Sequence, residues 1–360
     1  MRKATSKAVA QGQGTEKLWP AGEPGAMGGK TDSPEGTAPF VRRRVLLAAP
    51  LLAVALAAPA LAFPDRTVVM IVPYGAGGNN DLLGRAMAPA MAAVLGQPVV
   101  VENRPGAGGS IGAAYVAQQA RPDGHTFLFT ASGLASSVSL SALTFDPVRD
   151  LAPIAGVGAI PSILIVPPNS SIRSFAEFLT AARTRQITYG SSGPGTGTHL
   201  GMELLAAAAG AQMIHVPYRG GSAAIYTDLI AGRLDAMLDI LGAGAVRARE
   251  GQARGLGVTS AERVADFADL PTVAEQGLPG FSFATWFGFF AHAATPPGAR
   301  AQLEEACLRA LATPVVQERL RQAGAIPIPT SAAGFGAYFN EDVERWAALL
   351  RAGRVQRLSD

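Results

Sequence analysis

Apolar runs that end in glycine-rich turns recur along this chain, and each is followed by a helical stripe. The first run, residues 68–72, has no polar alternation, which is typical of a strand covered on both faces in a parallel sheet. After the turn, apolar residues recur every four positions over residues 82–95, which predicts a helix with Asn80 or Asp81 available as its N-cap. The pattern therefore predicts a strand, a glycine turn and a helix.

The N–H groups that begin such a helix are unpaired and face the carboxyl end of the strand. The glycines of the turn, among them Gly77 and Gly78, leave room for an anion to approach these N–H groups. A carboxylate or a phosphate is the natural ligand of such a site. The alternative is that the glycines only make a tight connection between strand and helix, and this stretch alone leaves both interpretations open.

The same design returns in a second part of the chain, for which we expect a second lobe. Residues 187–189 predict a strand, residues 190–198 form a glycine loop, and residues 199–209 predict the helix that follows. Three hydroxyl groups accompany the backbone donors of this loop: Ser192, Thr196 and Thr198. Two helix starts suited to anions, one on each lobe, predict a clamp around a ligand.

Other predicted strands end in residues that a ligand could contact. Residues 125–130 form a third strand, and Ser132 lies in the loop after it. Asp239 follows another strand, where it accepts a hydrogen bond from a ligand or caps the next helix. Arg219 either pairs a ligand carboxylate or is a solvated surface charge. Residues 281–291 are dense in aromatic side chains and predict a strand that returns to the first lobe.

The N-terminal part has the pattern of an export signal. Arg42, Arg43 and Arg44 precede an uncharged apolar stretch that ends in Ala60-Leu-Ala62, so residues 41–62 predict a signal peptide cleaved near Ala62. The protein would then reside in the periplasm, and an uncleaved membrane anchor is the alternative. Residues 1–40 lack apolar periodicity and precede a segment that normally begins a chain, so we expect a non-native or disordered extension.

The formal charge of +3 comes from this N-terminal part. Residues 1–62 hold 8 of the 30 Lys and Arg and 4 of the 27 Asp and Glu, which leaves 22 basic and 23 acidic side chains, a net charge of −1, in the remainder. No clustered basic surface is predicted there, which argues against a nucleic-acid partner. Cys307 is the only cysteine, so no intramolecular disulfide is predicted.

No catalytic, cofactor or metal site is predicted. The four histidines lie in separate segments without metal-ligand spacing, and the carboxylates are scattered. The glycine at position 112 departs from the spacing of a dinucleotide-binding fingerprint after Gly106 and Gly108. Ser191 and Ser192 lack the spacing of a nucleophile elbow, and no His or Asp partner is identifiable for them.

Eight stretches in the same order along the predicted mature chain resemble the Bug-type substrate-binding receptors of tripartite tricarboxylate transporters. They are Val72-Pro-Tyr-Gly-Ala-Gly-Gly-Asn-Asn-Asp81, Gly96-Gln-Pro-Val-Val-Val-Glu-Asn-Arg-Pro-Gly-Ala-Gly-Gly109, Pro122-Asp-Gly124, Gly193-x-Gly-Thr-x-Thr-His199, Val216-Pro-Tyr-Arg-Gly220, Gly232-Arg-Leu-Asp235, Leu270-Pro-Thr-Val-Ala-Glu-Gln-Gly-Leu-Pro-Gly280 and Trp286-Phe-Gly288. The resemblance implies an α/β, two-lobed type II periplasmic-binding-protein fold with two crossover strands and an interlobe cleft. We expect lobe I to comprise residues 63–162 and 286–360, and lobe II residues 163–285.

The resemblance also implies a small carboxylate ligand, held largely by backbone amides, hydroxyl groups and waters at the two glycine loops. The expected ligand-binding residues are Tyr74, Gly77, Gly78, Asn79, Asp81, Ser132, Ser192, Thr196, Thr198 and Asp239. Many relatives carry Asp-Asn-x-Pro-Ser where this chain has Asp239-Ile-Leu-Gly-Ala243, so an amide and a hydroxyl near the cleft are missing here.

The function that the resemblance implies is that of a monomeric receptor, without a cofactor, that delivers its ligand to membrane transport subunits. Two alternatives stay open. One is a sensing receptor that feeds a signalling partner, and the other is an exported enzyme that uses the same cleft.

Overall fold

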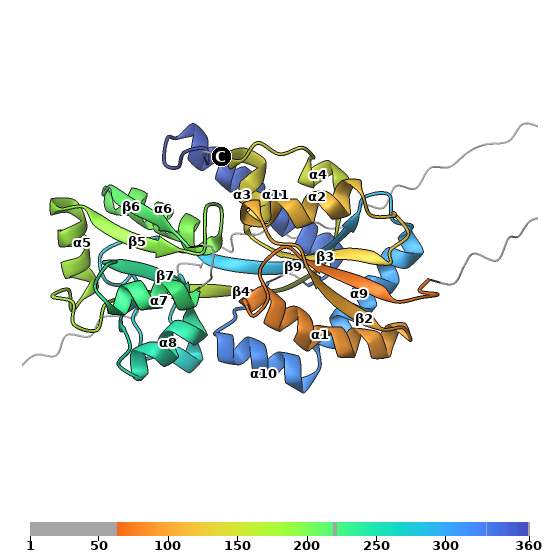
Figure 1. Ribbon diagram of the computed structural model, residues 1–360, viewed down its shortest axis with the longest axis horizontal. Coiled ribbons are helices and arrows are strands. Elements are labelled where there is room, and N and C mark those ends of the chain that lie inside the picture. The colour runs from red at the N-terminus through yellow and green to blue at the C-terminus, as the bar shows by residue number, and fades with distance from the viewer. Residues whose placement is uncertain (1–62, 219–221, 329, 359–360) are drawn as a thin grey trace, which may run out of the picture. The chain divides into compact units, whose positions relative to one another are not determined.

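The computed structural model describes residues 63–218, 222–328 and 330–358 (Figure 1). The expected extension at residues 1–40, the signal peptide at residues 41–62 with its cleavage site at Ala62, and Arg219 lie outside the described residues. Within the described ranges, no helix is both long and apolar enough to cross a membrane.

Lobe I is built on parallel strands that the sequence predicts. They are β1 (Val68–Val72), β2 (Val99–Asn103) and β3 (Thr126–Ala131), with β1 between the other two. Strand β9 (Ala284–His292) lies antiparallel beside β3, so that Phe129 pairs with Phe289. The prediction that the aromatic segment returns to the first lobe is thereby confirmed.

Strand β4 (Leu151–Val166) belongs to both lobes. Residues 151–161 pair with β9, and residues 162–166 pair with β7 and β8. The apolar residues 163–166 predict a strand, and the structure confirms a strand there. It begins much earlier than expected, at Leu151, because the register shifts near Gly156 and Gly158 let one long strand bend and continue. Strands β4 and β9 join the two lobes, while the expected lobe boundaries at residues 162/163 and 285/286 stay a prediction.

Lobe II continues the sheet on the other side of β4. Its strands are β5 (Ile187–Ser191), β6 (Met213–Pro217), β7 (Ala236–Ile240) and β8 (Arg254–Val258). Strand β5 is parallel to both β6 and β7, and β4 is antiparallel to β7 and β8. The carboxyl ends of β5, β6 and β7 therefore lie at one edge of the sheet.

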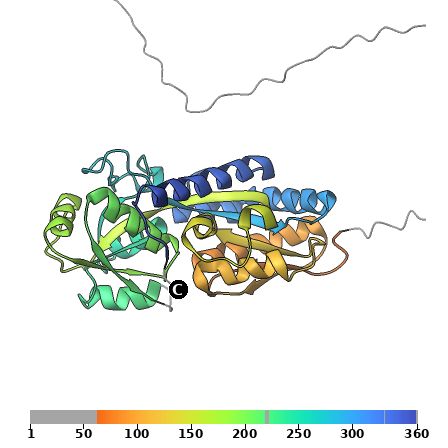
Figure 2. The same cartoon turned by 90° about the horizontal axis from the view of Figure 1, so that it is seen from above.

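Helices cover both faces of the lobe I strands. One face packs against α1 (Asn79–Leu95), α9 (Pro297–Leu311) and α10 (Pro314–Ala323). The other face packs against α2 (Ser110–Gln118), α3 (Gly133–Leu140) and α11 (Ala332–Arg351), and the short α4 (Pro147–Asp150) precedes β4. Helix α11 runs along β4 (Figure 2). Apolar residues without alternation in β1, β3 and β9 follow from this cover on both faces.

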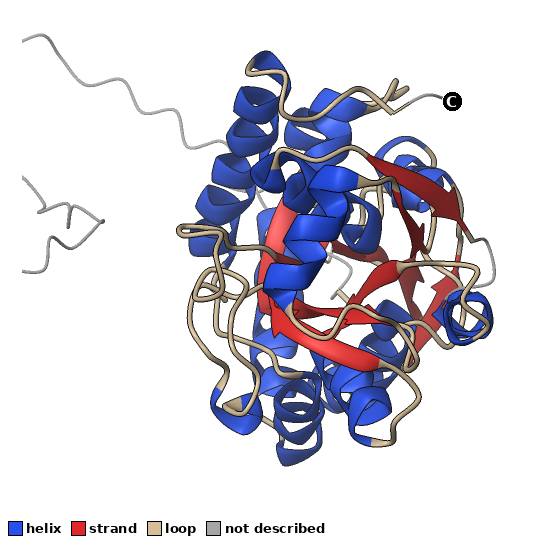
Figure 3. Cartoon of the chain, turned by 90° about the vertical axis from the view of Figure 1, so that its left-hand side faces the viewer, coloured by secondary structure: helices blue, strands red, loops and turns tan. Residues whose placement is uncertain are grey.

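Lobe II has the same layered arrangement (Figure 3). Helices α5 (Phe175–Thr184) and α6 (Gly197–Ala209) cover one face, and α7 (Ser222–Ile230) and α8 (Leu241–Arg249) cover the other. Short 3-10 turns lie at Ala107–Gly109 before α2 and at Ala265–Phe267. The molecule is therefore a mixed α/β protein with two lobes joined by two crossing strands.

Candidate functional site

The two lobes meet where the loops after β1, β2 and β3 face the loop after β5. A Cβ atom on Gly108 would lie 3.0 Å from the carbonyl oxygen of Pro194, and one on Gly133 would lie 2.9 Å from that of Gly195. Side chains at these positions would push the loops apart. The lobes are therefore closed on each other here, and most of the expected site residues lie on these loops.

In lobe I, Asp81 organises the glycine loop. Its Oδ2 accepts hydrogen bonds from the Gly77 N–H at 2.9 Å and from Arg85 Nε at 3.0 Å, and its Oδ1 accepts one from Asn103 Nδ2 at 3.0 Å. Burial alone would raise the pKa of Asp81, but Arg85, the Gly77 N–H and Asn103 together lower it. Asp81 is a charged carboxylate that holds the loop, and its oxygens are occupied within the protein.

The start of α1 differs from the sequence expectation. Asn80 and Asp81 lie inside the helix, and Gly78 is the N-cap, with Asn79 the first helical residue. The expectation of a side-chain cap from Asn80 or Asp81 is wrong because Asp81 turns back to Gly77 instead.

Asn103, which the sequence analysis missed, ties this loop to the end of β2. Besides Asp81, its Nδ2 donates to the backbone oxygen of Tyr74 at 3.1 Å, and its Oδ1 accepts from Arg85 at 3.0 Å. The hydroxyl group of Tyr74 lies beside Gly109 and Gly133. A Cβ atom added to Gly109 would lie 3.0 Å from the hydroxyl oxygen of Tyr74, and one added to Gly133 would lie 3.5 Å from it. Burial raises the pKa of Tyr74, so this residue is a neutral hydroxyl where the lobes meet.

Three helices that begin where the lobes meet lack a side-chain cap. In the described structure, no side chain accepts from the first N–H groups of α1, α3 or α6, whose N-caps are Gly78, Ser132 and Thr196. Asp146, Ser174 and Ser331 cap the helices α4, α5 and α11, whereas α2, α8, α9 and α10 likewise have no side-chain cap from the described residues. The position of α3 and α6 where the lobes touch, and not the missing cap alone, singles out these helix ends. The N–H groups at the uncapped helix ends are those that would bind an anion.

Two of the buried polar side chains that lack a partner in the described chain lie at the starts of α1 and α3. Ser132 is 3% exposed and Asn80 is 7% exposed, and no hydrogen bond within the described part of the chain reaches Ser132 Oγ or Asn80 Nδ2. A buried polar atom without a partner is costly, so an occupant that satisfies it is favoured.

In lobe II, the hydroxyl groups of the glycine loop bond to one another and to the loop backbone. Thr198 Oγ1 accepts from the Ser192 N–H at 3.1 Å and lies 3.2 Å from Thr196 Oγ1. Thr196 Oγ1 donates to the backbone oxygen of Gly193 at 2.7 Å. These bonds bring Ser192, Thr196 and Thr198 together, as the sequence predicts.

Asp239 has other partners. It is 5% exposed, its Oδ2 accepts from the Tyr226 hydroxyl at 2.8 Å, and its Oδ1 accepts from the Ile240 N–H at 2.9 Å. Burial raises its pKa, against the lowering effect of these two donors. Both oxygens of Asp239 are therefore engaged inside lobe II, and the bonds recorded for the described residues do not join it to the other expected site residues.

Beneath the lobe II loop, the structure brings together two histidines that the sequence places in separate elements. The rings of His199 on α6 and His215 on β6 stack with their centroids 4.1 Å apart, and His215 Nε2 lies 2.5 Å from Ser191 Oγ. The sequence analysis missed this pair because sixteen residues separate its members, and only the pairing of β5 with β6 makes them neighbours. The buried Ser191 has no exposed oxygen for a substrate to reach.

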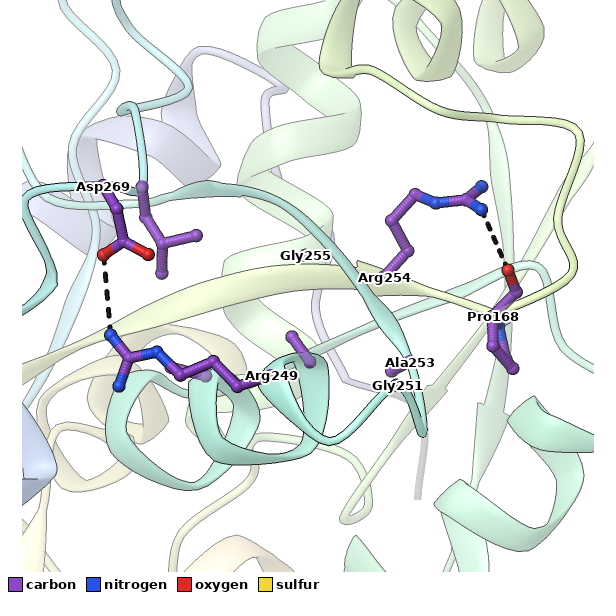
Figure 4. A pocket seen from close by; sticks show the side chains of 10 residues that line it. Pro168, Arg249, Gly251, Ala253, Arg254, Gly255 and Asp269 are labelled. Carbon is purple, nitrogen blue, oxygen red and sulfur yellow. Dashed lines mark hydrogen bonds and ion pairs between the residues drawn. The ribbon is translucent and has the colours of Figure 1, made fainter.

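A surface pocket on the outside of lobe II is less suited to a ligand. It has a volume of about 420 Å³ and includes Arg249 and Arg254 in its lining (Figure 4). Arg254 donates to the backbone oxygens of Pro168, Ser170 and Ile172, and Arg249 lies 3.5 Å from Asp269. Both guanidinium groups are thus engaged by the protein itself.

Residues 83–354 match the family model described as the tripartite tricarboxylate transporter family receptor. The chain belongs to this family. BugT of Bordetella pertussis, a relative, is 32% identical over 82% of this chain and 92% of its own length. The tripartite tricarboxylate transporter receptors are periplasmic solute-binding proteins and not enzymes, so the family favours a binding role for the site.

Two solved structures share the fold of this receptor. MatC from Rhodopseudomonas palustris, with bound malate, is 31% identical, covers 80% of this chain and all of its own, and has a TM-score of 0.73. Rpa4515 from R. palustris, with adipate, is also 31% identical, covers 82% of this chain and all of its own, and has a TM-score of 0.75. Both are similar to this receptor over its described part.

Proposed function

We propose that this receptor captures a small carboxylate-bearing ligand between its two lobes and delivers it to the membrane subunits of a tripartite tricarboxylate-type transporter. The observation that carries the proposal is that helix ends without a side-chain cap from the described residues occur in both lobes, at α1, α3 and α6, and that Gly133 at the start of α3 touches Gly195 just before α6. Each end offers N–H groups and a positive partial charge to an anion. The malate and adipate bound to the similar MatC and Rpa4515 support a dicarboxylate as the ligand class.

The expected ligand contacts fall into two sets. Backbone N–H groups at Gly78 and Asn79, with the hydroxyl groups of Tyr74 and Ser132, would bind one end of the ligand from lobe I. From lobe II, the hydroxyl group of Ser192 and the N–H and hydroxyl groups of Thr198 would bind the ligand. Thr196, whose hydroxyl group donates to the backbone oxygen of Gly193, would hold this loop in its binding shape. Gly77 and Asp81 hold the first loop in shape, and we expect Asp239 to act in the same indirect way because both of its oxygens are engaged.

Ligand binding would then drive closure. A ligand that touches both lobes gains all its contacts only when the lobes are closed, so its differential affinity shifts the population toward the closed form. The membrane subunits would recognise the closed form, whose surface differs from that of the open one. For export we propose cleavage of the signal peptide near Ala62.

The experiment that tests the proposal is native mass spectrometry of the protein purified gently from the periplasm, followed by release and identification of any bound molecule. Calorimetric titrations with malate and adipate follow on the ligand-free protein. A retained or titrated carboxylate supports the proposal. The proposal is contradicted if the purified protein carries no bound small molecule and binds no mono-, di- or tricarboxylate from a panel.

The transport role needs its own test, because a sensing receptor would bind the same ligand. Affinity capture from membranes, with and without ligand, should recover integral membrane transport subunits in a ligand-dependent way. Recovery of a sensor protein instead would replace transport by signalling.

A further inference from the structure

The two histidines beneath the lobe II loop are bonded directly to it. The N–H of Gly195 donates to His199 Nδ1 at 3.2 Å. The N–H of Gly193 donates to Ser191 Oγ at 3.1 Å, and that oxygen lies 2.5 Å from His215 Nε2. Gly195 is also the residue that touches lobe I at Gly133. The loop that faces lobe I is therefore fixed by one nitrogen atom of each histidine.

These bonds define the protonation state of His199. A backbone N–H can only donate, so the Nδ1 atom that accepts from Gly195 carries no proton. The single ring proton of His199 is then on Nε2, 4.0 Å from Glu203 Oε1. A second proton on Nδ1 would set two donors against each other and break the bond to Gly195.

The surroundings oppose a second proton on either ring. His199 lies in the first turn of α6, where the helix dipole disfavours a positive charge. The two rings stack at 4.1 Å, and Tyr189 stacks on His215 at 5.2 Å. Burial lowers the pKa of both histidines to about 4, and Glu203, whose carboxylate accepts from the Tyr189 hydroxyl, pulls the pKa of His215 the other way. Among the described residues, the titratable groups that face the pair are Tyr189 from β5 and Glu203 from α6.

We infer that His199, stacked on His215, is a positioning residue that holds the lobe II loop in its ligand-binding conformation only while its ring is neutral, so that acidification releases the ligand. The inference rests on the proposed function and names its regulation. In a molecule with a loosened loop, His199 is hydrated and its pKa returns toward the ordinary value of 6.5. The ligand-free form then takes up more protons than the ligand-bound form between pH 6.5 and 4, and affinity falls as the pH falls through this window.

The test compares His199→Asn with the wild-type protein by calorimetric titration at pH 7.0 and pH 5.0, with malate and adipate as probes. The Oδ1 of Asn can accept from the Gly195 N–H but does not titrate. We expect the affinity of the wild type to fall about tenfold more than that of His199→Asn between the two pH values. Protonation of the probe affects both proteins equally and cancels in this comparison.

His292→Asn is the matched control. His292 Nδ1 accepts from the Ala294 N–H at 3.0 Å, which is the same kind of bond at the end of β9, away from the ligand loop. This variant should keep the pH response of the wild type. His199→Leu, which leaves the Gly195 N–H without an acceptor, should bind weakly at both pH values.

A second measurement does not depend on the ligand. In the ligand-free wild type, the amide signal of Gly195 should shift in NMR spectra with the titration of His199, and it should stay fixed in His199→Asn. If neither probe binds the wild type at pH 7.0, the proposed carboxylate function fails while this measurement still decides the inference.

Two results would overturn the inference. One is a wild-type affinity that, between pH 7.0 and pH 5.0, falls no more than the affinity of His199→Asn does. A wild-type affinity that rises on acidification would mean that a charged His199 attracts the anion. The other is a Gly195 amide signal that ignores the titration of His199.

Discussion

At the scale of single residues, the site is defined by polar atoms that the protein itself leaves unsatisfied. The hydroxyl of Ser132 and the amide of Asn80 are buried without a partner within the described ranges, whereas the buried Asp81 and Asp239 have their oxygens engaged. In the function proposed above, the unpartnered donors would bind the ligand, and the partnered carboxylates would fix the loops around it. This division separates contact residues from supporting residues within one motif.

Gly78→Val and Thr196→Val should each weaken carboxylate binding by at least roughly tenfold, which is the loss of about one charge-assisted hydrogen bond. Valine at position 78 would stand at the N-cap of α1, where the ligand approaches, and valine at position 196 removes a hydroxyl from the lobe II loop. Titration calorimetry with the retained ligand, or with malate and adipate, measures the effect.

The controls make the same substitutions away from the site. Gly298→Val places its side chain in open space at the start of α9, and Thr184→Val removes a hydroxyl from the exposed end of α5. Both should bind as the wild type does. Equal affinity in the site variants and the controls would place the ligand elsewhere.

At the scale of secondary-structure elements, local patterns predicted most strands and helices, and long-range contacts decided what the patterns missed. The strands β1, β3 and β9 follow from apolar runs, and Ser174, which caps α5, has the Glu177 three residues later that is typical of a capping box. The full length of β4 was not predicted, because the glycines near its register shift at residues 156–158 are typical of the end of a strand.

The candidate site divides in the same way. The glycine loops were predictable because strand, turn and helix are contiguous in sequence. The partners of Asp239 and the pairing of His199 with His215 were not predictable, because they depend on which strands lie side by side and on which face each side chain points.

A buried hydrogen bond supports the aromatic packing between β9 and α11. Trp286 Nε1 donates to Asp342 Oδ2 at 2.7 Å. Asp342→Leu would leave this N–H without its acceptor, so we expect the free energy of unfolding to fall by about 1–3 kcal/mol. Asp342→Asn keeps an acceptor and should lose less. Chemical denaturation of the wild type and both variants measures the free energy of unfolding of each. An Asp342→Leu variant as stable as the wild type would show that the bond contributes nothing.

At the scale of the whole molecule, the lobes also touch at a second place besides the ligand loops. The start of α8 in lobe II lies against the end of α10, where a Cβ atom on Gly242 would overlap the carbonyl oxygen of Gln322. Arg321 at this end of α10 also pairs with Asp266 at 3.2 Å. The sequence departure after Asp239 thus places a glycine where the two helix ends touch.

Gly242→Ala should therefore disfavour closure. We expect a larger radius of gyration in solution X-ray scattering of the ligand-bound protein and an affinity several-fold lower, because part of the binding free energy would be spent on relieving the overlap. Gly298→Ala, in open space, is the control. An unchanged radius and affinity would mean that the helix ends shift apart without moving the lobes.

Ligand binding should also stabilise the whole fold. A ligand present at a hundred times its dissociation constant adds about 2.7 kcal/mol to the free energy of unfolding if it binds only the folded state. Scanning calorimetry with malate or adipate measures the rise in melting temperature. A titratable ligand that leaves the melting temperature unchanged would contradict binding to the native cleft.

The place of β9 in the sheet has a consequence for how the molecule is made. Residues 284–292 insert between β3 and β4, so both of those strands keep an open edge until about four fifths of the 360-residue polypeptide has been synthesised. Contacts so distant in sequence form late, and an incomplete sheet stays loose. Under the export proposed above, such a delay would suit a chain that crosses the membrane unfolded and completes its core afterwards.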